Sequence, residues 1–158
     1  MIILGTKMLK NSLIATFFLC LPLTVIAEPS VLKVNKRLKL KSSTKYIQAV
    51  HKEINVTGKS PEAIKFAILD GMLRTKGYKW TFEGEGKGYI LAGFDWRGDT
   101  NIMKIEFNDS LIQLKYHQAW GDYVCKNLIE GVCYKNDRSY YNYVKNLRIS
   151  IEQQISNL

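Results

Sequence analysis

Few side chains in this sequence are of the types that perform chemistry. The histidines are His51 and His117, and the cysteines are Cys20, Cys125 and Cys133. Nucleophilic catalysis needs a base beside the nucleophile. A zinc site needs several ligands at short spacing, such as a Cys-x-x-Cys motif, which this sequence lacks. We therefore expect no metal, no cofactor and no catalytic residue, and these patterns favour a non-enzymatic protein.

His117 is the histidine that falls on a predicted strand. It shares one face of that strand with Gln113 and Lys115. Side chains alternate between the two faces of a strand, so this face lies opposite the apolar residues and an exposed histidine is expected. A hydrolase would instead bring a carboxylate and a hydroxyl within hydrogen-bond reach of His117.

The first 27 residues have the three parts of a secretory signal peptide. Lys7 and Lys10 precede an apolar run over residues 13–26, which ends at Ala27. The run is shorter than the roughly 20 apolar residues of a membrane-spanning helix. We expect cleavage after Ala27, no transmembrane span in the mature chain, and a periplasmic or secreted location.

Export would change the number of cysteines in the mature chain and the chemistry expected of them. Cleavage removes Cys20 and leaves Cys125 and Cys133 as a pair. In an oxidising compartment such a pair favours a disulfide. Closing so short a loop contributes about 2–3 kcal/mol in chain-entropy terms.

Residues 28–59 are predicted to form a basic arm that includes a short helix. Between Pro29 and Lys52 there are seven basic residues and no acidic one. Apolar and mostly basic residues alternate along 31–41, which is typical of a strand or of an extended segment. The arm either binds an anionic surface, such as phospholipid or lipopolysaccharide, or is a solvated leader. Its candidate binding residues are Lys33, Lys36, Arg37, Lys39 and Lys41.

Residues 60–158 are predicted to form a single α+β domain. Ser60 and Pro61 are typical of a helix start, and the helix is expected over 61–76. A period of two then predicts strands over 78–83, 89–96, 102–107 and 111–117. Asp137, Arg138 or Ser139 is expected to cap a last helix, whose apolar stripe is Tyr140, Val144, Leu147, Ile151 and Ile155. The predicted architecture is a four-stranded antiparallel meander with helices packed on one face, in the order αββββα.

The third and fourth strands have a definite predicted register. A two-residue loop at Asp109 and Ser110 pairs Phe107 with Ile112 and places the apolar residues on one face. The same register sets Lys104 opposite Lys115, which is tolerable only where that face meets water or an anion. The candidate binding residues on this outer face are Arg97, Lys104, Lys115 and His117.

Several segments together resemble a group of small exported proteins and lipoproteins of Gram-negative bacteria with no assigned activity. They are Gly-Tyr-Lys-Trp at 77–80, Gly-Tyr-Ile-Leu-Ala at 88–92, Arg97, the strand 103–107, and the Tyr-rich helix segment 140–147. The resemblance spans about residues 60–151. It implies a helix, a strand meander and a closing helix, together with a location in the cell envelope. It carries no catalytic residues.

The chain also departs from that group. Asp99 stands where the group commonly has a histidine, and Tyr143 stands where it has a tryptophan. The loop between Cys125 and Cys133 is an addition, and the sequence around Cys20 does not fit a lipidation motif.

These observations predict a non-enzymatic exported envelope protein that binds another protein or an anionic envelope component. Nucleic acid is not the expected partner, because an exported protein seldom meets it. The alternative is a secreted factor that acts on a host or a competitor, such as a small hydrolase.

Overall fold

The computed structural model describes residues 29–35, 44–135 and 137–158. The chain folds into three α-helices, seven strands and one short 3-10 helix in these ranges. In chain order they are α1 (Thr44–Val50), β1 (Ile54–Asn55), α2 (Pro61–Leu73), β2 (Thr81–Gly86), β3 (Tyr89–Trp96), β4 (Asp99–Phe107), β5 (Leu111–Trp120), the 3-10 helix η1 (Gly121–Tyr123), β6 (Leu128–Ile129), β7 (Val132–Cys133) and α3 (Arg138–Ser156).

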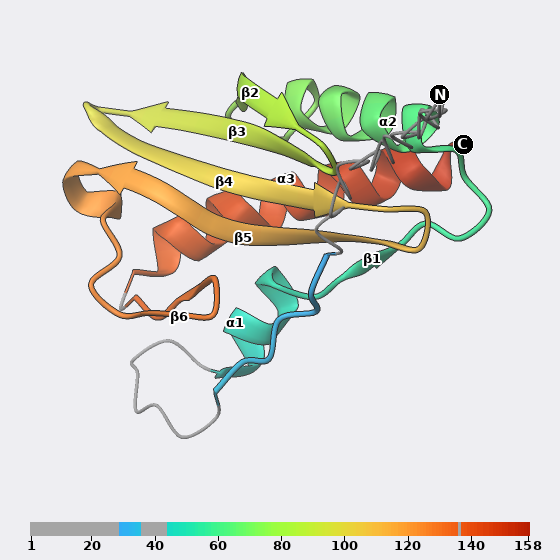
Figure 1. Cartoon of the computed structure of the whole chain (residues 1–158). Helices are drawn as coiled ribbons and strands as arrows, with labels where there is room; N and C mark the ends of the chain where they lie inside the picture. The colour runs from blue at the N-terminus through green and yellow to red at the C-terminus, as the bar shows by residue number, and fades with distance from the viewer. Residues whose placement is uncertain (1–28, 36–43, 136) are drawn as a thin grey trace, which may run out of the picture.

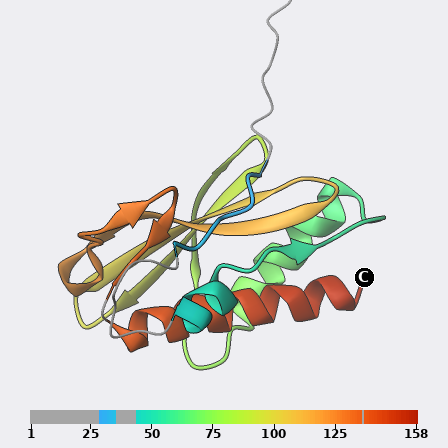
Figure 2. The ribbon, with the colours of Figure 1, turned by 90° about the horizontal axis from the view of Figure 1, so that it is seen from below.

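The predicted α+β fold is confirmed. Five antiparallel strands form one sheet in the order β1-β5-β4-β3-β2, with α2 and α3 packed behind it (Figure 1). Helix α1 lies beside α3 (Figure 2), and β6 and β7 form a separate small hairpin. The helices therefore cover one face of the sheet, which we call the inner face, and leave the opposite, outer face to be covered by other segments.

Helix α2 begins where the sequence predicts. The Ser60 hydroxyl accepts a hydrogen bond from the Ala63 N–H at 3.2 Å, and Pro61 occupies the first turn. The helix ends at Leu73, three residues before the predicted end at Lys76. Gly77, at φ 95°, turns the chain, and the Trp80 N–H bonds to the Met72 carbonyl.

The register between β4 and β5 is the predicted one. Phe107 pairs with Ile112, and Lys104 lies opposite Lys115. Trp96 pairs with Asp99 across a two-residue turn in which Arg97 and Gly98 both have positive φ, 53° and 88°. Such turns match the natural twist of a hairpin.

The prediction of four strands is corrected by a fifth, β1, which the sequence placed in the arm. Ile54 pairs with Ile112 of β5, and the Val56 N–H bonds to the Ser110 carbonyl. Apolar residues of α1 and β1 belong to the core, so the packed structure extends to residues before Ser60. These are Ile47, Val50, Ile54 and Val56.

The first predicted strand is also shifted along the chain. It starts at Thr81 rather than at residue 78. A period of two over 78–83 places Trp80 and Phe82 on one inward face, but only Trp80 is buried, and Phe82 is 52% exposed on the edge strand.

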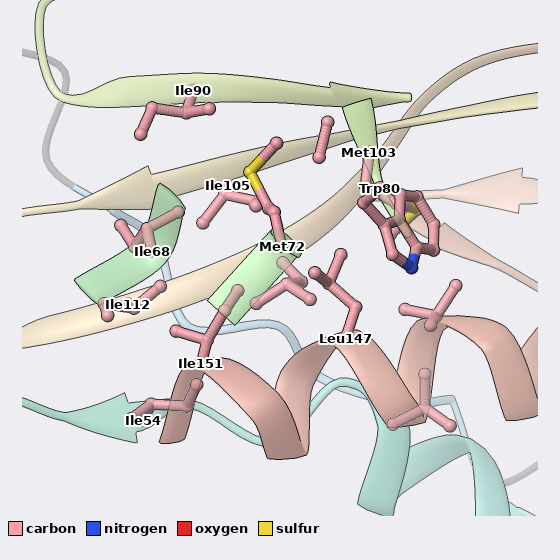
Figure 3. Close-up of a cluster of buried hydrophobic side chains, with 14 of the residues drawn as sticks. Ile54, Ile68, Met72, Trp80, Ile90, Met103, Ile105, Ile112, Leu147 and Ile151 are labelled. Atoms are coloured by element: carbon pink, nitrogen blue, oxygen red, sulfur yellow. The ribbon is translucent and has the colours of Figure 1, made fainter. Parts of the chain in front are cut away.

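The core lies between the sheet and the two longer helices (Figure 3). Met72 of α2 and Leu147 and Ile151 of α3 point toward Ile105 of β4. The helices approach closely at Gly71, where an added Cβ would lie 2.8 Å from the Ile151 Cα. Of the three residues predicted to cap α3, Asp137 is the N-cap, and its carboxylate accepts hydrogen bonds from the Ser139 and Tyr140 N–H groups. The predicted apolar stripe of α3 is buried in full: Tyr140, Val144, Leu147, Ile151 and Ile155.

Candidate functional site on the outer face of the sheet

A cluster of three charges occupies the outer face at the centre of β4 and β5. The Glu106 carboxylate receives Lys104 Nζ at 2.9 Å through Oε1 and Lys115 Nζ at 2.5 Å through Oε2. Lys104 also lies over the ring of Tyr89, at 4.6 Å from the centroid. The anion that the opposed lysines require is therefore a carboxylate of the same sheet.

The electrostatic balance at Glu106 favours the charged form. Burial by itself raises the pKa of the carboxyl, but the hydrogen bonds and positive charges of Lys115 and Lys104 outweigh it and hold the pKa below its usual 4.5. Two lysines share one carboxylate, so a single positive charge remains in excess at this cluster.

The start of the basic arm is docked on this face. Lys115 Nζ donates to the Ser30 hydroxyl at 2.8 Å, and the Leu32 N–H donates to Gln113 Oε1 at 3.2 Å. The Asn35 N–H donates to the Tyr134 hydroxyl at 2.6 Å. The segment 29–35 is thus tied to β5 and to the chain following β7, which is not the behaviour of a solvated leader.

The alternation predicted for the arm is visible in this docked segment. Leu32 and Val34 pack against the core, whereas Val31, Lys33 and Asn35 are exposed. Of the predicted arm residues, Lys33 therefore projects into solvent. The other four, Lys36, Arg37, Lys39 and Lys41, lie outside the described residues.

The other two predicted outer-face residues stand apart from the charge cluster. His117 is the extra residue of a β-bulge, because Ile102 pairs with Gln118 and the next residue, Met103, pairs with Tyr116. Arg97 lies in the β3–β4 turn, and its guanidinium is 5.3 Å from the centre of the Trp96 ring. The four outer-face candidates do not converge on one site.

The geometry at His117 bears on the hydrolase alternative. The side chain is exposed, and it makes no hydrogen bond or ion pair with any residue of the described ranges. No carboxylate or hydroxyl of the described residues therefore forms the hydrogen bond with His117 that a general base would need. Within the same ranges, no three His, Cys, Asp or Glu side chains gather as metal ligands would.

A polar residue that the sequence analysis did not select, His51, is part of the structure under the arm. It is 2% exposed, and its Nδ1 lies 3.2 Å from the Leu114 carbonyl oxygen. Burial lowers the pKa of His51 to about 4, with the hydrogen bond to Leu114 opposing the shift. Its other ring nitrogen, Nε2, is buried without a partner in the described residues. Nothing in the sequence around His51 signals this position.

His51 and its neighbours cover the edge of β5 that does not pair with β4. Ile54 and Asn55 pair with the first two residues of the strand. The Leu114 carbonyl accepts from the Gln113 amide at 3.3 Å and faces His51 Nδ1. The Tyr116 N–H then bonds to the Gly131 carbonyl at 3.0 Å. An unpaired strand edge is a site for adventitious pairing, and residues 51–56 together with Gly131 cover this one.

The predicted disulfide is present and holds the segment that borders the docked arm. Cys125 and Cys133 are bonded, with 5.7 Å between their Cα atoms. The enclosed hairpin exposes Leu128 and Ile129. Its turn meets the arm, since a Cβ added to Gly131 would lie 3.4 Å from a Leu32 methyl carbon.

The outer face thus combines the docked segment 29–35, which carries Lys33, with a disulfide-closed loop that carries exposed apolar side chains. Among the described residues, no helix has the length and apolar character needed to cross a membrane. Comparisons with protein-family models, with curated proteins and with solved structures find no match for this chain.

Proposed function

We propose that this chain is a non-enzymatic protein exported to the bacterial envelope, where it binds an anionic lipid surface. Its contact region is the disulfide-closed loop together with the basic arm. The proposal rests on the predicted signal peptide and on one structural relationship, the packing of Leu32 in the arm against Gly131 in the loop.

That relationship supports a lipid partner because it brings two kinds of side chain together. Leu128 is 47% exposed and Ile129 is 36% exposed, and the neighbouring Val31 of the arm is 48% exposed. Lys33 of the arm and Lys126 of the disulfide-closed loop are exposed as well. Apolar side chains beside basic ones are the usual composition of surfaces that bind anionic membranes.

The central lysines contribute less to such binding. Lys104 and Lys115 already share the Glu106 carboxylate, and the Lys115 side chain is only 15% exposed. Binding is therefore assigned to the periphery of the outer face rather than to its centre.

The test is co-sedimentation of the mature protein with vesicles of phosphatidylcholine, with and without phosphatidylglycerol, and with lipopolysaccharide in a parallel series. We expect binding only to the anionic preparations. It should weaken from 0.1 M to 1 M salt, as the Debye length falls from about 10 Å to about 3 Å. The two series distinguish phospholipid from lipopolysaccharide as the source of charge.

Substitutions then identify the region. Replacing Lys36, Arg37, Lys39 and Lys41 by Gln should weaken binding by up to about a thousandfold, at about 1 kcal/mol per basic residue near the surface. The double variant L128S/I129S should also reduce it. The control K76Q/K79Q removes two exposed lysines between α2 and β2 and should leave binding unchanged, whereas K39Q/K41Q removes the same number of charges from the arm and should weaken it. Equal binding to neutral and anionic vesicles, or equal loss in the control, would refute the proposal.

A further inference from the structure

Helix α2 carries a second apolar face that no part of the described chain covers. The core side of the helix is formed by residues such as Ile64, Ile68 and Met72, all at most 2% exposed. On the opposite side, Phe66 is 72% exposed and Leu73 is 62% exposed. With a period of 3.6 residues, a residue and its i+7 neighbour lie on the same side of a helix, so these two form one stripe.

The stripe is continuous and bordered by charge. Leu69, three residues after Phe66, is half-buried and lies between its two ends. Asp70 and Arg74 form an ion pair beside it, with 2.7 Å between Oδ2 and Nε. A surface helix normally presents polar residues to water on this side, so exposed Phe and Leu here indicate a contact surface.

We propose that this face of α2 is the interface of a weak symmetric homodimer, in which two α2 helices pack antiparallel. In such a pair the two-fold axis passes near Leu69 and Asp70. Phe66 of each copy then faces Leu73 of the other, because residues in a two-fold contact are exchanged between the copies. The seven-residue spacing of the two large side chains makes the stripe complementary to itself.

The charges at the two ends of α2 fit the same arrangement. Glu62 is in the first turn, and Lys76 follows the end of the helix; both are exposed. An antiparallel pair sets Glu62 of one copy beside Lys76 of the other. It also places the positive end of one helix dipole beside the negative end of the other. A parallel pair would instead bring like charges together.

The neighbouring sheet edge does not provide an equally good contact. Strand β2 is interrupted by a bulge between Phe82 and Gly84. The Glu83 side chain lies over Gly93 and accepts a hydrogen bond from the Thr81 hydroxyl at 2.7 Å. Bulges and charged residues protect edge strands against pairing. The dimer is therefore assigned to the helix side chains rather than to an added strand.

The interface is tested by sedimentation velocity of the mature protein over a range of concentrations. We expect a reversible monomer–dimer equilibrium. F66E and L73E should each weaken the dimer at least tenfold while leaving the circular dichroism spectrum unchanged, because both side chains project into solvent in the monomer. The control L128E introduces the same charge on an equally apolar exposed position outside α2 and should leave the dimer intact.

A charge exchange tests the antiparallel orientation. E62K should weaken the dimer by a few-fold, and the double variant E62K/K76E should restore it. A protein that stays monomeric at all concentrations, or a dimer that F66E and L73E do not weaken, overturns the interface. Failure of the double variant to restore the dimer overturns the antiparallel pairing. None of these measurements involves lipid, so they are independent of the proposed membrane role.

Discussion

Lys115 Nζ lies 2.5 Å from Glu106 Oε2, and the same carboxylate also binds Lys104 directly across the sheet from Lys115. The Glu106 and Lys115 side chains are 10% and 15% exposed. The carboxylate thus separates two lysines that would otherwise face each other in a region largely closed to water.

We predict that Glu106→Gln destabilises the protein by about 1–3 kcal/mol at neutral pH. The loss is below that of a fully buried pair, because Lys104 keeps access to solvent. It should be measured by urea unfolding. The double variant E106Q/K115M removes one of the unbalanced lysines and should recover part of the loss. Equal stability of E106Q and the wild type would contradict the account. The depressed pKa of Glu106 means that its contribution is present above about pH 4.5 and is lost as the pH falls through the lower folded-state value.

His51 predicts a second, separate dependence on pH. Its pKa is about 4 in the folded state and 6.5 when unperturbed, so the unfolded chain binds the extra proton between these values. The contribution of His51 to the free energy of unfolding should be fully present above pH 6.5. The free energy of unfolding should then fall by up to about 3 kcal/mol as the pH drops to 4. In urea unfolding at several pH values, His51→Leu should flatten this fall, whereas His117→Gln, at the exposed histidine, should keep it. An unchanged slope in H51L would show that His51 is not the group responsible.

The hydrogen bonds of Gln113 lead to a prediction about the docking of the arm on β5. Its Oε1 accepts from the Leu32 N–H, and its Nε2 donates to the His51 carbonyl at 3.0 Å. Gln113→Leu keeps the volume but leaves both partners unsatisfied, at a cost of about 1–3 kcal/mol for each buried group. We expect faster hydrogen exchange at the Leu32 amide and faster proteolysis within 29–35. Gln118→Leu, exposed on the same strand, is the control. Unaltered exchange at Leu32 in Q113L would argue against the docking.

The disulfide makes a fourth prediction. The denatured, unreduced mature protein should contain no titratable thiol, since Cys125 and Cys133 are bonded. The variant C125S/C133S should lose about 2–3 kcal/mol, the contribution expected for a short closed loop. It should also reduce lipid binding less than L128S/I129S does, because it leaves the apolar side chains in place. Detection of two free thiols would rule out the bond.

Local patterns in the sequence are enough to predict much of this fold. Ser60 and Pro61 specify the start of α2 because capping and proline geometry act within one turn. The apolar stripe from Tyr140 to Ile155 requires a buried face on α3. The pairing of Phe107 with Ile112 follows because a one-residue slip would turn every apolar side chain of the hairpin outward. The pairing of the cysteines followed from their number and from the predicted compartment.

Such patterns do not predict contacts between segments that are far apart in the sequence. Ile54 and Asn55 are too short a strand to show a period, and they become β1 only because β5 offers an unpaired edge. His51 looks unremarkable in the sequence, since its burial depends on β5 and on the docked arm. The pairing of Glu106 with both opposed lysines depends on rotamers across two strands.

Residue patterns thus specify helices α2 and α3, the register between β4 and β5 and the basic character of the arm, because these depend on neighbours along the chain. Packing between distant segments sets where the arm begins to dock, which charges are paired and which apolar faces of the described chain remain uncovered. These properties depend on which surfaces meet, and packing brings together residues that are far apart in the sequence.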